Sequence, residues 1–192
     1  GYTLLNVTLP FVVNPHLVAR APYHPANDFA AIGMICVSPS LVTVHPSVPV
    51  HNINDLLALA RARPGQINYA SAGIGTNPHI AGELFNHLGK AKLVAVHFKG
   101  GGPGLIAAMS GEVSATFTNI AETSGFVRAR KLRAIAVTSP RRSPAFPELA
   151  TVAESGLPGY EFVTWFGPLA PAKTPPRVIT LLNDNQIGRA HV

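Results

Sequence analysis

The feature that most constrains this sequence is a regular alternation of strand-like and helix-like segments between residues 52 and 138. Apolar residues at helical spacing predict helices at 53–63, 78–88, 103–109 and 120–130, and short apolar runs predict strands at 66–71, 93–98, 113–118 and 132–138. Turns rich in glycine or proline separate these segments. Such alternation is typical of an α/β fold, in which a parallel-rich sheet is flanked by helices.

The segments outside this block favour a second structural unit. Residues 1–7, 29–44 and 162–169 are strand-like, and a further helix is predicted from Pro176, with Thr174 before it as the cap. We therefore expect a discontinuous and incomplete lobe 1, made of residues 1–44 and 162–186, and a lobe 2 made of residues 45–161. The last residues, 187–192, match the translation of a common sequencing adapter, and we expect them to be a non-native tail.

Charge and hydropathy limit the classes of partner. The chain has 15 Lys and Arg against 9 Asp and Glu, a formal charge of +6, which suits an anionic ligand, a nucleic acid or an anionic membrane, and also many ordinary soluble proteins. The tightest basic groups, at 128–133 and 141–142, are not interleaved with aromatic residues, which argues against a nucleic-acid groove. No apolar run reaches the ~18 residues that a membrane-spanning helix needs.

The first of three candidate loops contains Ser71, Gly73, Gly75 and Thr76, and leads into the helix that opens near Pro78. Ligands of open parallel sheets bind beyond the carboxyl ends of the strands. Glycines let the backbone approach a ligand, and the free N–H groups of a helix N-terminus bind carboxylate or phosphate. Thr76 can also cap that helix, and the same glycines suit a plain strand-to-helix turn.

Two further loops follow the next predicted strands. Gly100 and Gly101 lie in a glycine run whose consecutive N–H groups can form an anion-binding nest, and Lys99 either adds charge there or lies in solvent. Asn119 ends the following strand, where it can donate to a carboxylate or cap the helix that starts at Ile120. The loops together predict a site for a small anion.

The sequence carries no recognisable catalytic motif. The histidines are dispersed without metal-type spacing, there is no nucleophile elbow, and near the first loop only Ser71 and His79 could act as nucleophile or base. The single cysteine, Cys36, lies in an apolar run and is expected to be a buried thiol. We therefore expect no catalytic residue, metal or cofactor, and keep an enzyme acting on an anionic substrate at these loops as the weaker alternative.

The same loops carry a family signature. Residues 69–85 (YASAGIGTNPHIAGELF) and 96–104 (VHFKGGGPG) resemble the receptors of tripartite tricarboxylate transporters, also called the Bug family of extracytoplasmic solute receptors. Further matching segments are 132–139, 142–147, 151–159 and 165–171. The resemblance covers residues 1–186.

This resemblance implies a periplasmic binding protein-like fold of type II, with two lobes that close on a ligand. It implies a periplasmic monomer that delivers a small carboxylate, such as a di- or tricarboxylate, to the membrane permease subunits of a tripartite transporter; a solute sensor for a two-component system remains an alternative. Carried over by position, the residues that would bind the carboxylate through backbone amides, hydroxyls and ordered waters are Ser71, Gly73, Gly75, Thr76, Gly100, Gly101 and Asn119, with Thr8 as a further candidate.

Departures from the family pattern refine this expectation. Phe98 stands where the family often has Tyr, and Thr118 stands where it often has Asp. Less negative charge at that position disfavours an amine-bearing ligand and favours a plain carboxylate. The family's first loop, a Pro-Gly-Gly turn near the mature N-terminus, is not found in this chain, so we expect an N-terminal truncation and a signal peptide in the missing segment.

Overall fold

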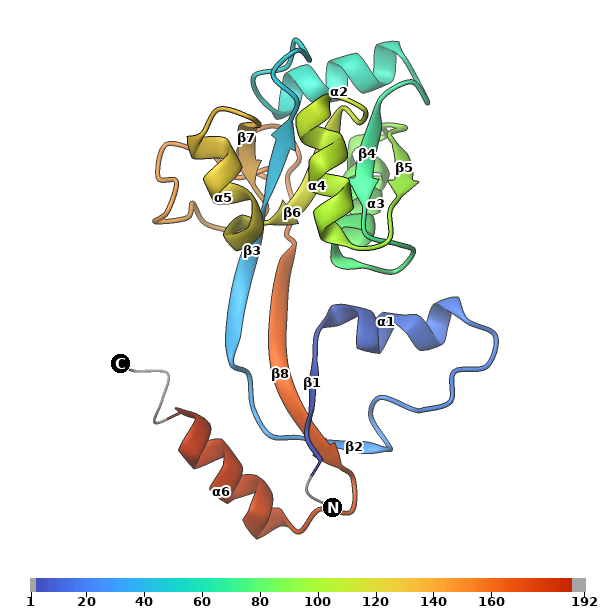
Figure 1. Ribbon diagram of the computed structural model, residues 1–192, viewed down its shortest axis with the longest axis vertical. Coiled ribbons are helices and arrows are strands. Elements are labelled where there is room, and N and C mark those ends of the chain that lie inside the picture. Colours follow the sequence, from blue (N-terminus) through green and yellow to red (C-terminus); the bar gives the residue numbers. More distant parts are fainter. Residues whose placement is uncertain (1–2, 188–192) are drawn as a thin grey trace. The chain divides into compact units, whose positions relative to one another are not determined.

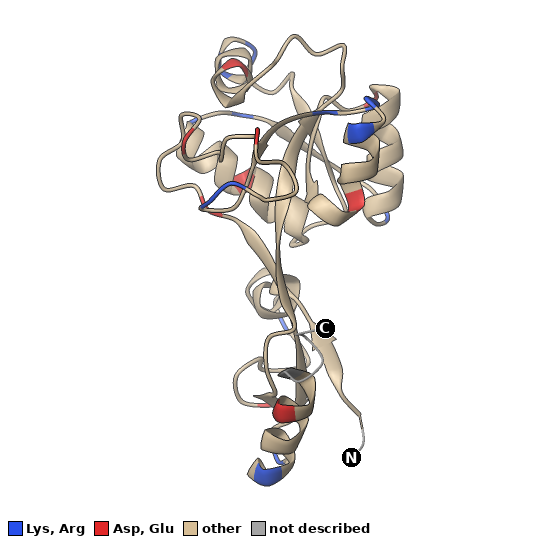
Figure 2. Ribbon diagram, turned by 90° about the vertical axis from the view of Figure 1, so that its left-hand side faces the viewer, with Lys and Arg blue, Asp and Glu red and all other residues tan. Residues whose placement is uncertain are grey.

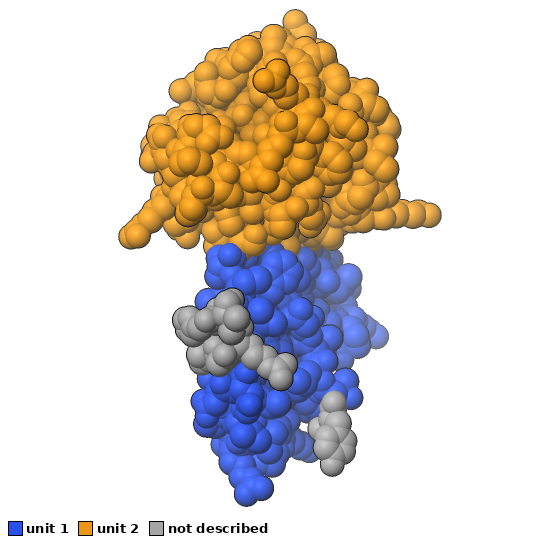
Figure 3. Space-filling view, turned by 60° about the vertical axis from the view of Figure 1, so that its left-hand side comes forward, with its two compact units in different colours: residues 1–37, 164–192 blue, residues 38–163 orange. Residues whose placement is uncertain are grey.

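The structure is a computed structural model that describes residues 3–187. By its internal contacts the chain divides into two compact units (Figure 3). Unit 1 comprises Gly1–Val37 with Thr164–Val192, and unit 2 comprises Ser38–Val163. All but the first residue of the expected tail, 187–192, lies outside the described residues. No helix within 3–187 is long and apolar enough to cross a membrane.

Unit 2 is built on a mixed sheet whose strands run in the order β7–β3–β6–β4–β5 (Figure 1). Strand β4 is parallel to both β5 and β6, whereas β3 is antiparallel to β6 and β7. The strands are β3 (Cys36–Val44), β4 (Asn68–Ser71), β5 (Val94–His97), β6 (Ala115–Asn119) and β7 (Arg133–Val137). The predicted parallel alternation therefore holds for β4 to β7, while β3 runs against it because no helical crossover precedes β3.

The predicted helices of the central block are all observed, with shifted ends. They are α2 (Ile53–Ala62), α3 (Asn77–Gly89), α4 (Gly101–Ser110) and α5 (Ile120–Arg128). The side chain of Asn52 caps α2 by accepting a hydrogen bond from the Asp55 N–H at 2.9 Å. Helix α4 begins at Gly101 rather than Pro103, since proline suits the first turn of a helix, where no N–H partner is required.

Aromatic side chains fill the core between the sheet and α3. Tyr69, Phe85, Phe117 and Tyr160 are fully buried. The ring of Phe117 lies 5.5 Å from those of both Tyr69 and Phe85, and the hydroxyl of Tyr160 donates to the Ala81 carbonyl at 3.0 Å. These contacts hold α3 directly against β4, and so set where the N-terminus of α3 lies relative to the end of β4.

Unit 1 contains antiparallel strands and two helices. Strand β8 (Val163–Pro171) pairs antiparallel with β1 (Leu5–Val7) and with β2 (Phe29–Ala31). Helix α1 (Leu9–Leu17) follows β1, and α6 (Pro176–Ile187) follows β8. The parallel pairing expected for this lobe is therefore not found in its described residues, because β1 and β2 both join β8 without a helical crossover between parallel neighbours.

Helix α1 was not predicted from the sequence. Its hydrophobic pattern is weak, and Pro15 lies inside it. An aromatic cluster holds it in place: the rings of Phe11 and Tyr23 stack at 4.6 Å, and Phe29 meets Phe11 edge-on at 5.1 Å. The Tyr23 hydroxyl also donates to the Phe11 carbonyl at 2.9 Å. Packing between distant residues thus overrides the poor local pattern.

The prediction that Cys36 is a buried thiol is wrong. Cys36 is exposed. The pairing of β3 with β6 begins at Ser40, opposite Asn119, and burial follows the same boundary, since the residues from Ser40 to the end of β3 are buried. Cys36 and Val37 precede that paired stretch, so the apolar run at this point does not correspond to core.

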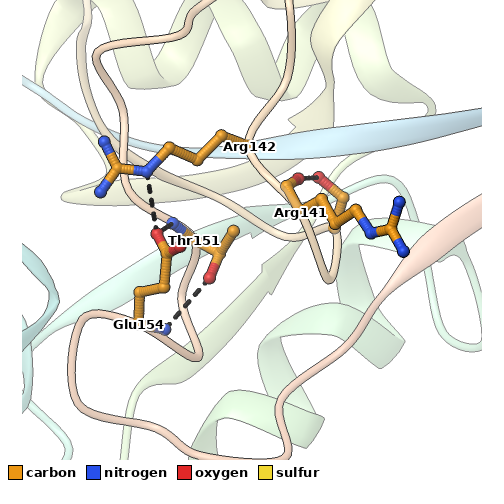
Figure 4. A network of polar contacts seen from close by, with 5 residues as sticks. Arg141, Arg142, Thr151 and Glu154 are labelled. Carbon is orange, nitrogen blue, oxygen red and sulfur yellow. Dashed lines mark hydrogen bonds and ion pairs between the residues drawn. The ribbon is translucent and has the colours of Figure 1, made fainter.

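Charged residues are dispersed over unit 2, as Figure 2 shows, and one ion pair stands out. The N–H of Thr151 donates to the Glu154 carboxylate at 3.0 Å, and the N–H of Glu154 donates to the Thr151 hydroxyl at 3.0 Å (Figure 4). Arg142 Nε donates to the same carboxylate at 3.0 Å. This reciprocal capping arrangement lowers the pKa of Glu154, first through the backbone hydrogen bond from Thr151 and then through Arg142.

Because the pKa of Glu154 is lowered in the folded protein, its contribution to stability is present above the unfolded-state pKa and is lost as pH falls through the folded-state pKa. Glu154→Gln keeps an acceptor for the Thr151 N–H but carries no charge. We expect wild-type protein to lose more thermal stability than the variant between pH 6 and pH 3, measured by circular dichroism melts. Parallel pH profiles of the two proteins would contradict this expectation.

Candidate ligand-binding site

The three predicted loops meet at one edge of the unit 2 sheet. In the parallel register, Ser71 at the end of β4 lies opposite His97 at the end of β5, and β6 runs alongside β4 with Thr116 opposite Ala70. The carboxyl ends of β4, β5 and β6 therefore coincide, and the loops after them lead into the N-termini of α3, α4 and α5 (Figure 1). This edge is where ligands of such sheets bind.

The loop after β4 is held by its own hydroxyl groups. Ser71 is 1% exposed, and its Oγ donates to the Gly73 carbonyl at 3.0 Å and accepts from the Gly73 N–H at 3.2 Å. The Thr76 hydroxyl donates to the same carbonyl at 2.6 Å, so Thr76 does not cap α3 through its side chain. Gly73 has φ +129°, a conformation that requires glycine.

The backbone donors of this first loop are largely engaged within it. The Gly75 N–H donates to Nδ1 of His79 at 3.2 Å, and the Thr76 N–H donates to the Gly73 carbonyl at 3.3 Å. With the Gly73 N–H bonded to Ser71, three of the predicted ligand donors already have intramolecular partners. The loop therefore forms a rigid wall of the site in this structure, and its role as a direct donor to ligand stays a prediction.

The loop after β5 presents its donors more openly. Gly100 has φ +107° and is the N-cap of α4, whose first residues are Gly101 and Gly102. The N–H groups in the first turn of a helix have no intrahelical partner and carry the positive end of the helix dipole. The carboxylate of Glu122 lies beside Gly101, where an added Cβ would be 3.1 Å from its Oε2. An incoming anion at α4 must therefore contend with one neighbouring acid.

Asn119 is both a cap and a donor. Its Oδ1 accepts from the Ala121 N–H at 2.9 Å, which caps α5, and from the Ser38 hydroxyl at 3.0 Å. The two roles proposed from the sequence are thus compatible, because the amide oxygen serves the cap while the amide nitrogen remains a hydrogen-bond donor. Ser38 was not predicted, and its place opposite Asn119 depends on the pairing of β3 with β6.

His97 is the residue that sequence reasoning missed. Its Nδ1 lies 3.1 Å from the Ser71 Oγ, and its ring centroid lies 5.2 Å from that of His79. The signal that could have found it is the register: the last residues of two adjacent parallel strands face each other across the pleat. Thr8 is the exception among the predicted residues, since it lies in unit 1 at the N-cap of α1 and the other candidates lie in unit 2.

The Ser71–His97 contact is not arranged as a nucleophile and its base. A nucleophilic serine must donate its proton to the imidazole, but the Ser71 hydroxyl donates to the Gly73 carbonyl. The enzyme alternative assigned the partner role to His79, whose Nδ1 instead accepts from Gly75. Within the described residues, no group of three His, Cys, Asp or Glu side chains is placed to hold a metal ion. The geometry favours binding through hydrogen bonds.

Comparison with known proteins decides the family. Residues 1–188 match the family described as "Tripartite tricarboxylate transporter family receptor". The chain belongs to this receptor family. BugT of Bordetella pertussis is 32% identical over 185 residues, which are 95% of this chain and 57% of BugT. The chain spans little more than half the length of such curated relatives.

Solved members of the family confirm the predicted fold class. The chain superposes with a TM-score of 0.86 on Rpa4515 of R. palustris with adipate, at 33% identity and covering 97% of this chain and 62% of that one. The periplasmic binding protein BugD gives the same TM-score at 29% identity, over 96% and 62% of the two chains. The fold is therefore the α/β fold of periplasmic binding proteins, as the receptor resemblance implied.

Proposed function

We propose that this chain is part of an extracytoplasmic receptor that binds a small carboxylate, with a di- or tricarboxylate as the favoured class. The observation that carries the proposal is the convergence, at one sheet edge, of the open N-terminus of α4 at Gly100 and Gly101 with the amide of Asn119. Both offer N–H donors to an anion without a metal or a catalytic group. A relative of the same family was solved with adipate, which supports this ligand class.

The side chains near the site favour a ligand without an amine. Thr118 is 5% exposed, and its hydroxyl is paired with that of Thr116. No carboxylate is therefore offered at this position to an ammonium group. The one acid beside the loops is Glu122 near Gly101, within the described residues. A plain carboxylate that binds to helix-terminal N–H groups and the Asn119 amide fits these surroundings.

We further propose that unit 2 is lobe 2 of the receptor, expected at 45–161, and that unit 1 is lobe 1, expected at 1–44 and 162–186. Closure of two lobes on one ligand would follow from contacts that form only when both touch it. Thr8, ahead of α1, is the candidate that unit 1 would contribute. On this proposal the receptor is a periplasmic monomer and delivers its ligand to permease subunits of a tripartite transporter.

Isothermal titration calorimetry tests the proposal directly. We expect the full chain to bind adipate, malate or citrate saturably, and not to bind 1,6-hexanediol, which has the chain of adipate but no carboxylate. Recovery of unaltered ligand by mass spectrometry after incubation would separate a receptor from an enzyme. A well-folded protein that bound no organic acid of the panel, or that bound the diol equally well, would contradict the proposal.

A further inference from the structure

The inference concerns the two histidines that meet beside the carboxylate loops, His79 on α3 and His97 at the end of β5. Their ring centroids are 5.2 Å apart, so two positive charges on this pair would repel each other. The proton that one ring takes up therefore discourages a proton on the other. Their hydrogen bonds show which of the two can carry the charge.

His79 is held in its neutral form. Its Nδ1 accepts a hydrogen bond from the Gly75 N–H at 3.2 Å, and a proton on that nitrogen would oppose one N–H to another. Burial lowers the pKa of His79, and His97 acts in the same direction, while the carboxylate of Glu83 on the same helix acts against them. Glu83 itself accepts a hydrogen bond from the buried Tyr69 hydroxyl at 2.9 Å, which ties it to β4.

His97 has the opposite arrangement. Its Nδ1 lies 3.1 Å from the Ser71 Oγ, whose own hydrogen is directed to the Gly73 carbonyl at 3.0 Å. The Ser71 oxygen is therefore the acceptor, and His97 Nδ1 is the donor. This bond is the same whether the ring is neutral or protonated. His97 is also exposed, so water can solvate the charge of the imidazolium ion.

The donor role of Nδ1 leaves Nε2 as the nitrogen that gains or loses the proton. In the neutral ring Nε2 is an acceptor and cannot hydrogen-bond to a carboxylate, whereas in the protonated ring it is a charged donor. The charged groups around this edge are few: Lys99 follows in the same loop, and Glu122 lies beside Gly101. Glu83 stands on the far side of His79 and is bonded to Tyr69.

We propose that His97 is a ligand-contacting residue that binds a carboxylate of the ligand as the imidazolium ion, so that ligand binding is coupled to the uptake of one proton at His97. Ser71 orients the ring, and His79 stays neutral beside it. The inference rests on the proposed carboxylate-binding function and adds to it a proton-linked contact. It names His97 as a determinant of specificity for anionic over neutral ligands.

Proton linkage gives the test a direct readout. Calorimetric titration of the full chain with adipate, in two buffers of different ionisation enthalpy, measures the number of protons bound with the ligand. We expect up to one proton to be taken up at pH 7.5, and an affinity about fivefold to tenfold higher at pH 6.5 than at pH 8.5, as expected if the ligand raises the pKa of His97 by roughly one unit. The affinity rises as pH falls because only the protonated ring donates through Nε2.

Matched variants assign the proton to one histidine. His97→Asn keeps a donor for the Ser71 Oγ but cannot be charged, and we expect it to abolish both proton uptake and the pH dependence. His79→Asn keeps an acceptor for the Gly75 N–H and is expected to retain both. His87→Gln alters an exposed histidine at the other end of α3 and should match wild type. Circular dichroism melts check that each variant is folded.

The outcomes separate this inference from the proposed function. Adipate binding without proton uptake, or a His97→Asn variant with the wild-type pH dependence, overturns the role of His97 and leaves the receptor function standing. Loss of proton uptake in His79→Asn alone would move the charge to the wrong ring and likewise overturn it. If wild-type protein binds no carboxylate at any pH, the proposed function fails, and the inference fails with it.

Discussion

Gly82→Ala is expected to lower the free energy of unfolding by about 3 kcal/mol, at the upper end of what overpacking a core costs. A Cβ at Gly82 would lie 2.3 Å from the Tyr69 ring, and Tyr69 is fully buried. The ring cannot simply move aside, because its hydroxyl donates to the His79 carbonyl and to Glu83. Chemical denaturation monitored by circular dichroism measures the change.

The matched control is Gly125→Ala in α5. Gly125 is also a helical glycine, but it is exposed, and a Cβ added there would meet no heavy atom within 4 Å. This substitution is expected to leave stability unchanged or to raise it by up to about 1 kcal/mol, as glycine-to-alanine changes do in open helix positions. Equal effects of the two substitutions would show that α3 does not approach β4 as closely as described.

The consequence of Gly82 reaches the ligand site. The close approach of α3 to β4 places His79 and the loop after Ser71 against each other, and the Tyr69 hydroxyl bonds directly to the His79 carbonyl. If Gly82→Ala protein remains folded, we therefore expect weaker carboxylate binding in addition to lower stability. A glycine inside a helix, far from any motif of the anion loops, would then matter for function through packing alone.

Gly102→Asp is expected to weaken carboxylate binding roughly tenfold or more, while the protein keeps its stability. Gly102 lies in the first turn of α4, is exposed, and has open space around it. An acidic side chain there stabilises a helix by interacting with its dipole. The same negative charge opposes a carboxylate at the α4 N-terminus, and a repulsion of about 1–3 kcal/mol follows from two unit charges a few ångströms apart in a partly solvated site.

Gly102→Asn is the control for this prediction, because it has the same size and no charge. Affinities for adipate by calorimetry, and melting temperatures, would be compared for the two variants and wild type. We expect Asn to bind ligand nearly as wild type and Asp to bind far more weakly, with the difference reduced at high salt. Equal affinities for the Asp and Asn variants would place the ligand away from the N-terminus of α4.

Local sequence pattern was sufficient for most of unit 2. The helical spacing of Ile53, Leu56, Leu57 and Ala60 predicted α2, and these are its buried residues. The glycine runs marked the loops that the structure places at one sheet edge. Both signals are local, because periodicity reflects burial of one face and glycine reflects the backbone conformation of a turn.

Other features depend on partners that are distant in the sequence. The antiparallel direction of β3, the exposure of Cys36 and the aromatic cluster around α1 each follow from contacts across many residues. Thr76 had the composition of a helix cap, yet its hydroxyl donates to Gly73. Side chains of this type have several acceptors within reach, and only the folded loop selects one of them.

The sequence by itself determined the fold class, the receptor family and the position of the glycine loops, since these rest on periodicity, turn composition and ordered motifs. The tertiary structure alone decided what the loops contain: Ser71 bonded to His97 from the neighbouring strand, His79 bonded to Gly75, and Asn119 shared between its helix and Ser38. The physical reason is register. Which side chains face each other across paired strands is set by the pairing, and a hydrogen bond depends on that to within a fraction of an ångström.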